Sequence, residues 1–96
     1  MAHYLILANF TDQGIRGVKE TTKRAKAFRE LASKMGAKIG DIYWTLGSYD
    51  VVLIMDAPND DTVASVLLKA GTFGNLKSQT LRAFDEKEME SILKSF

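Results

Sequence analysis

The feature that most constrains the fold is a pair of short segments that are apolar or aromatic at every position. These are residues 4–8 (Tyr-Leu-Ile-Leu-Ala) and residues 51–55 (Val-Val-Leu-Ile-Met). Successive side chains of a β-strand point to opposite faces of the sheet, so each segment presents apolar groups on both faces. A sheet with one solvated face alternates apolar with polar residues instead. The two segments therefore predict strands of a sheet that is covered on both faces.

The rest of the chain predicts two helices and two further strands. After Thr21 or Thr22, which can cap a helix, apolar residues recur at spacings of three and four as far as Gly36. The same spacing follows a second cap, Asn59, and ends at Gly71. The four strands are expected at residues 3–9, 39–46, 49–56 and 76–84.

The order of these elements predicts an α+β, ferredoxin-like fold with a four-stranded antiparallel sheet. Gly47 and Ser48 join the second and third strands as a hairpin with a tight turn. In a βαββαβ unit the strand order is four, one, three, two, and both helices pack on one face. Asp85 and Glu88 have the spacing of a capping box that opens a C-terminal helix. We expect residues 1–96 to form one domain of this kind.

Composition excludes several classes of function. The 96 residues include 13 basic and 12 acidic side chains, and a net charge of +1 gives no reason to expect strong attraction to nucleic acid or an anionic membrane. The absence of cysteine excludes disulfides, thiolate nucleophiles and cysteine metal sites. The N-terminus lacks signal-peptide features, and no apolar run approaches the roughly 18 residues of a membrane span. We expect a cytoplasmic protein whose partners include neither nucleic acid nor a membrane.

Four motifs resemble the GYD domain family, which is named for a Gly, Tyr and Asp signature. They are Asp12-Gln13-Gly14, the segment at residues 43–52 that contains Gly47-Ser48-Tyr49-Asp50, Asp56-Ala57-Pro58-Asn59-Asp60, and Thr80-Leu81-Arg82-Ala83-Phe84. The match covers nearly the whole chain. The family is similar to the dimeric α+β barrels, which implies two four-stranded sheets packed across a two-fold axis. Its wider relatives include monooxygenases, isomerases and plain ligand-binding or regulatory domains, so the resemblance does not choose one activity.

The helix-free face of the sheet is the reason to expect a partner. Both crossover helices pack on the other face, and a domain of this size buries only about two-thirds of the surface that its unfolded chain exposes. The C-terminal helix can cover part of the helix-free face, and a second copy of the sheet can cover all of it. We therefore expect a homodimer or a higher homo-oligomer, joined face to face.

One end of the predicted sheet gathers the candidate ligand-binding residues. The end of the first strand, the starts of the third and fourth strands and the loop before the first helix meet there. The polar candidates are Asn9, Thr11, Gln13, Tyr49, Asp50 and Lys77, and the candidates for apolar walls are Tyr43, Trp44 and Phe73. The alternative is that the polar side chains only cap loop backbone and satisfy hairpin amides. Trp44 has its own alternative as a core or interface residue.

No motif for a cofactor or a metal ion is present, and we expect neither. Gly-x-Gly-x-x-Gly and Gly-Lys-Ser/Thr phosphate loops are absent, and His3, the only histidine, lies in no metal-ligand spacing. The strand order places His3 at the end of the sheet opposite to the polar candidates, near Asp56 and Arg82. An exposed or paired histidine is a simpler interpretation there than a catalytic base.

Three functions stay open from the sequence, in the following order. The first is a homodimer that binds a small, partly apolar molecule in the pocket without necessarily transforming it. The second makes the same pocket catalytic, as in a cofactor-free monooxygenase or isomerase, with Tyr49 and Asp50 as acid and base. The third is a structural module whose sheet exists only to oligomerise.

Overall fold

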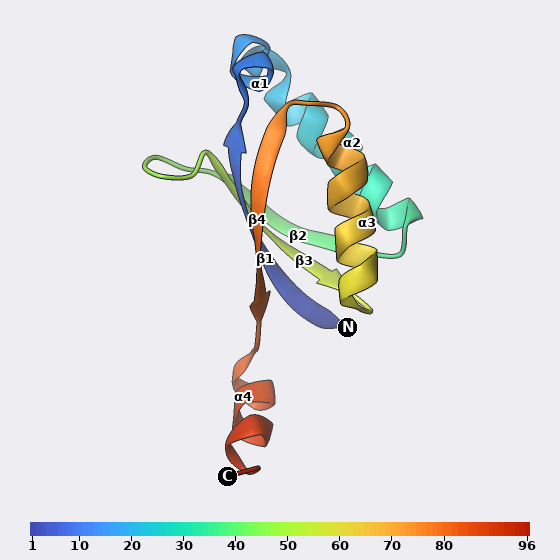
Figure 1. Cartoon of the computed structure of the whole chain (residues 1–96), viewed down its shortest axis with the longest axis vertical. Coiled ribbons are helices and arrows are strands. Elements are labelled where there is room, and N and C mark those ends of the chain that lie inside the picture. Colours follow the sequence, from blue (N-terminus) through green and yellow to red (C-terminus); the bar gives the residue numbers. More distant parts are fainter.

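The computed structural model describes residues 1–96 as a four-stranded antiparallel sheet with helices on one face and a C-terminal helix that stands apart (Figure 1). The elements are β1 (Ala2–Phe10), α1 (Asp12–Arg16), η1 (Val18–Glu20), α2 (Thr21–Lys34), β2 (Lys38–Trp44), β3 (Val51–Ala57), α3 (Asp60–Gly71), β4 (Leu76–Ala83) and α4 (Glu86–Leu93). The strand order is β2-β3-β1-β4, as expected of a βαββαβ unit. The predicted α+β, ferredoxin-like class is confirmed.

The register of the central strands decides which side chains face the helices. β1 pairs with β3 from Ala2 opposite Ala57 to Ala8 opposite Val51. Because paired residues share a face, the even-numbered residues of β1 and the odd-numbered residues of β3 line the face that carries α2 and α3. The buried side chains of these two strands are Tyr4, Ile6, Ala8, Val51, Leu53, Met55 and Ala57.

α2 and α3 complete the core over one half of this face. Ala32 of α2 and Val66 of α3 are fully buried in the same cluster as Tyr4 and Met55. The Tyr4 hydroxyl donates a hydrogen bond to Oδ1 of Asp60 over 2.5 Å, which joins the centre of the sheet to the first turn of α3. This hydrogen bond and the burial of the ring raise the pKa of Tyr4 above its ordinary value.

The opposite face carries no helix and is apolar along its centre. Leu5, Leu7 and Val52 are partly buried there, while Ile54 and Leu81 are 39 % and 40 % exposed. α4 does not cover this face, because it extends away from the sheet beyond the end of β4 (Figure 1). Strands β1 and β3, which are apolar on both faces, therefore pack against helices on one face. Their other face is not covered by any part of the chain.

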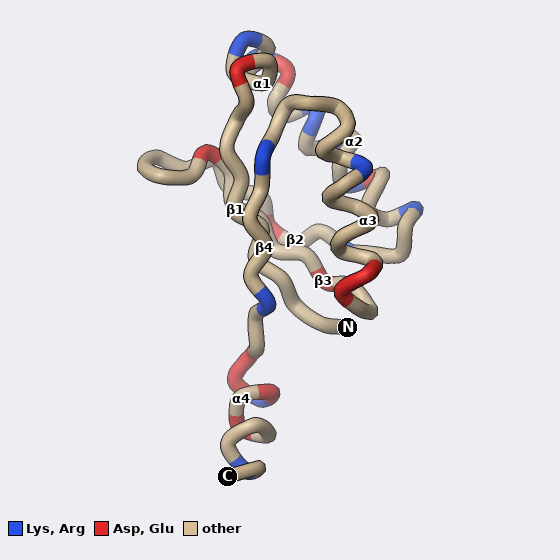
Figure 2. Tube along the Cα trace, viewed as in Figure 1, with Lys and Arg blue, Asp and Glu red and all other residues tan.

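Charge differs between α2 and α4, which lie in different parts of the molecule (Figure 2). α2 has five basic side chains and one acidic side chain, whereas α4 has three acidic side chains and one basic side chain.

Neither helix, nor any other in the structure, has the length and apolar character that crossing a membrane requires.

The hairpin between β2 and β3 is longer than predicted. Residues 45–50 separate the two strands, so the connection is not a tight turn. The Thr45 backbone N–H donates to the carbonyl oxygen of Asp50 over 2.8 Å, and the Thr45 hydroxyl donates to that of Tyr49 over 2.5 Å. Gly47 adopts a φ of +105°, a left-handed conformation that glycine reaches without a Cβ clash. The two hydrogen bonds of Thr45 close this connection at the ends of the strands.

The helix starts agree with the sequence in two cases and differ in one. The side chain of Asn59 accepts the backbone N–H of Thr62 over 2.9 Å, and the predicted capping box at the start of α4 is present. Thr21 does not cap α2 through its side chain, because it is the first residue of the helix. The short helix α1 and the 3₁₀ turn η1 were not predicted, since a five-residue and a three-residue helix show no apolar periodicity.

Candidate functional site

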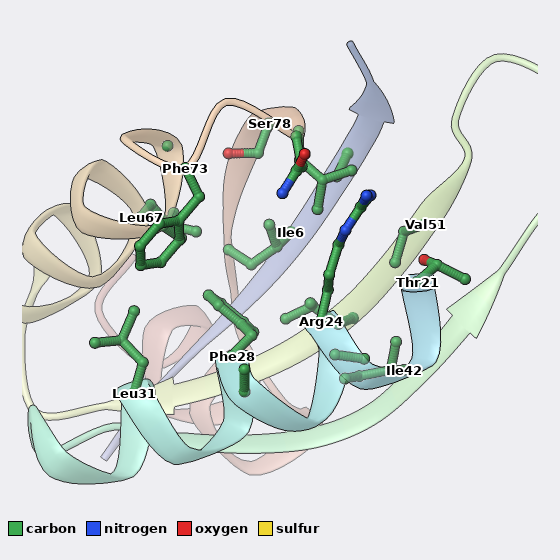
Figure 3. Close-up of a pocket in the computed structure, with 18 of the residues that line it drawn as sticks. Ile6, Thr21, Arg24, Phe28, Leu31, Ile42, Val51, Leu67, Phe73 and Ser78 are labelled. Atoms are coloured by element: carbon green, nitrogen blue, oxygen red, sulfur yellow. The ribbon is translucent and has the colours of Figure 1, made fainter. Parts of the chain in front are cut away.

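A cavity of about 810 Å³ lies between the sheet and the helices α2 and α3, at the end of the sheet where β1 finishes (Figure 3). Its volume is within the ~300–1,000 Å³ typical of small-molecule sites. Of the 22 residues that line it, 16 are hydrophobic. The largest of these are Phe10, Phe28, Trp44 and Phe73.

Small side chains create this space. Ala8 of β1, Ala25 of α2, and Ala70 and Gly71 of α3 all line the cavity. An alanine or glycine reaches only a short way from its backbone, so the helices leave a volume here that larger side chains would fill. The cavity adjoins the packed core at Ile6 and Leu53, which belong both to its lining and to that core.

Hydrogen bonds between two loops frame the end of the cavity. The backbone N–H of Thr11 donates to the carbonyl oxygen of Asn75 over 3.1 Å, and Nε2 of Gln13 donates to that of Phe73 over 2.8 Å. Gly14 is buried against the same loop, where an added Cβ would lie 2.0 Å from the carbonyl oxygen of Asn75. Only glycine allows this close approach. The segment after β1 is thereby fixed to the loop before β4.

Arg24 is the one charged residue in the cavity lining. Its side chain rises from α2 between Ile6 and Val51 (Figure 3). Nη1 donates to the carbonyl oxygen of Gly14 over 3.1 Å, and Nη2 donates to that of Gly17 over 2.9 Å. Its guanidinium forms no ion pair with a carboxylate of the chain. The cavity therefore carries a positive charge that no acidic side chain neutralises.

Trp44 forms one side of the cavity. Its indole Nε1 donates to Oγ1 of Thr21 over 2.9 Å, which ties the end of β2 to the start of α2. Of the three predicted apolar walls, Trp44 and Phe73 line the cavity. Tyr43 does not, because it precedes Trp44 on the same strand and pairs with Val52 on the helix-free face, where it is 58 % exposed.

Three of the predicted polar residues meet on the helix-free face instead. Asn9, Tyr49 and Lys77 line a shallow hollow of about 370 Å³. The Tyr49 hydroxyl donates to Oε1 of Gln79, a neighbour in the same hollow, over 3.0 Å. The sheet separates this hollow from the main body of the large cavity, and Ser78 lies at the edge of both.

The other three polar candidates form hydrogen bonds with backbone groups. The Thr11 hydroxyl donates to the carbonyl oxygen of Gly74 over 2.5 Å, Gln13 is bonded as described above, and Oδ2 of Asp50 accepts the backbone N–H of Phe10 over 2.9 Å. The structure thus does not bring the nine predicted residues into one site. The sequence analysis did not identify Arg24 and Phe28 as residues that line a cavity. The alanines among the apolar positions of both helices could have indicated unfilled space there.

A second polar cluster surrounds His3 at the other end of the sheet. Nδ1 of His3 lies 2.6 Å from Oδ1 of Asp56, and Nε2 lies 3.4 Å from carboxylate oxygens of Asp85 and Glu88. The hydrogen bond with Asp56, joined by the charges of Asp56 and Glu88, raises the pKa of His3 above 6.5. The hydrogen bond from the Glu88 backbone lowers the pKa of Asp85. His3, Asp85 and Glu88 are close enough to hold a metal ion, but the two carboxylates already form the capping box of α4.

Comparison with known proteins gives a family match and a curated relative. The family model described as the GYD domain matches residues 4–93. A protein of Thermus thermophilus named "Glutamine synthetase and cystathionine beta-lyase binding protein" is 30 % identical over 95 residues, which cover 98 % of this chain and 100 % of that protein.

Two solved structures resemble the fold. MtbAldR matches with a TM-score of 0.69 and 13 % identity over 88 % of this chain, and the chain spans only 52 % of the length of MtbAldR. TTHA0845 of Thermus thermophilus matches with a TM-score of 0.57 and 17 % identity over 88 % of this chain and 95 % of that one. At these identities the likeness concerns the fold only.

Proposed function

This chain belongs to the GYD domain family, and we propose that it is a small binding protein that takes a partly apolar small molecule into the cavity between the sheet, α2 and α3. The observation that carries the proposal is the cavity itself. It has the volume of a ligand site, mainly hydrophobic walls, and a few polar groups gathered at one end of the sheet.

Binding without chemistry is better supported than catalysis. The proposed acid and base, Tyr49 and Asp50, do not line the large cavity. Asp50 accepts the backbone N–H of Phe10, so its carboxylate already has a structural role. The Tyr49 hydroxyl is bonded to Gln79 on the helix-free side. A catalytic function that uses Tyr49 would therefore have to work in the shallow hollow, which offers little shelter from water.

The test is titration of the protein with N-phenyl-1-naphthylamine, an uncharged dye that fluoresces in apolar surroundings. We expect saturable binding to the wild type. Ala70→Phe fills the cavity from α3 and should weaken binding at least about tenfold, since it removes the space that the dye needs. Ala64→Phe adds the same ring to an exposed position of α3 outside the cavity and should leave binding unchanged. No saturable binding, or equal losses in both variants, would contradict the proposal.

We also propose a homodimer joined through the helix-free face. Leu5, Leu7, Val52, Ile54 and Leu81 support it, because a second copy would bury an apolar surface that neither the helices nor α4 covers. Analytical ultracentrifugation should give a dimer for the wild type. Ile54→Asp places a charge in this surface and should give monomers, whereas Leu68→Asp, on the exposed side of α3, should not. A wild type that sediments as a monomer at all concentrations would exclude the dimer.

A protein partner is a second candidate function. The name of the Thermus thermophilus relative states that it binds glutamine synthetase and cystathionine β-lyase. We propose that this chain binds an enzyme of one of these two kinds in the cytoplasm. Co-sedimentation with each purified enzyme from the organism that encodes this chain tests this. A complex with neither enzyme would remove this candidate and leave the cavity proposal intact.

A further inference from the structure

The geometry points to a ligand that carries one anionic group, such as a carboxylate, on an apolar body, with the anion held by Arg24, Thr21 and Asn75 at the end of the cavity. This inference rests on the proposed function, because it names the chemical class of the molecule that the same cavity would bind. These three residues have hydrogen-bond donors that no acceptor of the chain uses.

Arg24 supplies the charge and most of the free donors. A guanidinium has five N–H groups, and the two hydrogen bonds to Gly14 and Gly17 use one each on Nη1 and Nη2. The other three N–H groups have no acceptor in the chain. None of the other residues that line the cavity is charged, so nothing there competes with a bound anion or would favour a cation. A guanidinium that has free N–H groups and no carboxylate partner favours a ligand of opposite charge.

Thr21 and Asn75 add donors of the same kind. Oγ1 of Thr21 accepts the indole N–H of Trp44, which leaves its own hydroxyl hydrogen to donate. Oδ1 of Asn75 accepts from Nε2 of Gln13, which leaves the side-chain amide nitrogen to donate. Both residues line the cavity with Arg24. Each of these two oxygens already accepts one hydrogen bond, whereas the donors have no acceptor in the chain. This end of the cavity therefore suits the acceptor-only oxygens of a carboxylate.

The experiment displaces N-phenyl-1-naphthylamine with three ten-carbon compounds that differ in charge, namely decanoate, decan-1-ol and decylamine, at neutral pH. We expect decanoate to bind at least about tenfold more tightly than decylamine to the wild type, as hydrogen bonds to a charged group imply. Arg24→Gln should abolish this preference and leave displacement by decan-1-ol unchanged. The matched control is Arg29→Gln, which removes an arginine of the same helix that bonds one carbonyl oxygen outside the cavity and should keep the preference.

The outcomes separate this inference from the proposed function. If the dye binds but decanoate is no better than decylamine, or if the preference survives Arg24→Gln, the anion site is overturned and the apolar cavity stands. If the dye does not bind at all, both proposals fail. The wild-type ranking of the three compounds decides the question even if Arg24→Gln does not fold.

Discussion

Two halves of the layer between the sheet and its helices are built from the same strands and the same two helices, yet only one half is filled. Where β1 begins, Met55, Ala57 and Val66 are fully buried. Where β1 finishes, Trp44 and Phe73 stay 43 % and 59 % exposed around a cavity of about 810 Å³. Both halves are apolar, so hydrophobicity does not distinguish them.

The volumes of the side chains explain the difference. Along α2, Ala32 is fully buried in a cluster that includes the large side chains of Tyr4 and Met55. Two turns earlier, Ala25 shares the cavity with Ala8 of β1, so small residues occur on both sides. A core forms where large and small side chains complement each other, and a void forms where they do not. The packed half stabilises the fold, and the open half is available to a ligand.

The largest expected effect is the loss of a core side chain from the packed half. Met55→Ala should lower the free energy of unfolding by about 2–5 kcal/mol, because it removes a fully buried side chain and leaves a void. Phe73→Ala removes a larger but exposed side chain from the open half and should cost less than about 1 kcal/mol. Urea denaturation of both variants measures this. Equal decreases in the free energy of unfolding would show that the two halves contribute equally to stability.

The same substitution should have opposite consequences at two positions of α2. Ala32→Leu forces a larger side chain into filled space and should destabilise the fold by about 1–3 kcal/mol. Ala25→Leu enters the cavity and should change stability by less than about 0.5 kcal/mol while weakening dye binding. Thermal denaturation and dye titration together test the pair. A destabilised Ala25→Leu variant would mean that the cavity has no room for it.

A smaller effect is expected where the hairpin meets the open half. Asp50→Asn exchanges a charged acceptor of the Phe10 N–H for a neutral one and should cost about 1 kcal/mol. Tyr49→Phe removes only the exposed hydrogen bond to Gln79 and should stay within about 0.5 kcal/mol. Neither change should alter dye binding in the large cavity. A loss of dye binding in Tyr49→Phe would indicate that the dye binds in the hollow of the helix-free face instead.

The smallest expected effect depends on pH and lies at the packed end. The pKa of His3 is raised above its unfolded value of 6.5, so its stabilising contribution is complete below about pH 6.5 and is lost as the pH rises through the folded-state pKa. The melting temperature of the wild type should therefore exceed that of His3→Gln most at about pH 6 and least at about pH 9. His3 is the only histidine, so no other imidazole contributes. A difference that does not vary with pH would exclude this role.

Local patterns made most of the fold predictable. The Asn59 cap and the Asp85 and Glu88 capping box follow from residue types at fixed short spacings, which act within one or two turns of chain. The strand order follows from the order of the elements along the chain. The length of the hairpin and the short helix α1 did not follow. They depend on hydrogen bonds such as that from the Phe10 N–H to Asp50 and that from Thr11 to Gly74, which form only after distant segments meet.

The sequence by itself determined that the chain has a two-faced sheet, two amphipathic helices and membership of the GYD domain family, because periodicity and motif are properties of neighbouring residues. It also named Trp44 and Phe73, which line the cavity. Only the tertiary structure decided that the space lies under α2 and α3, that Tyr43 faces the other way, and that Arg24 has no carboxylate partner. A cavity depends on which volumes fail to complement each other across elements far apart in the chain, and no local pattern records that.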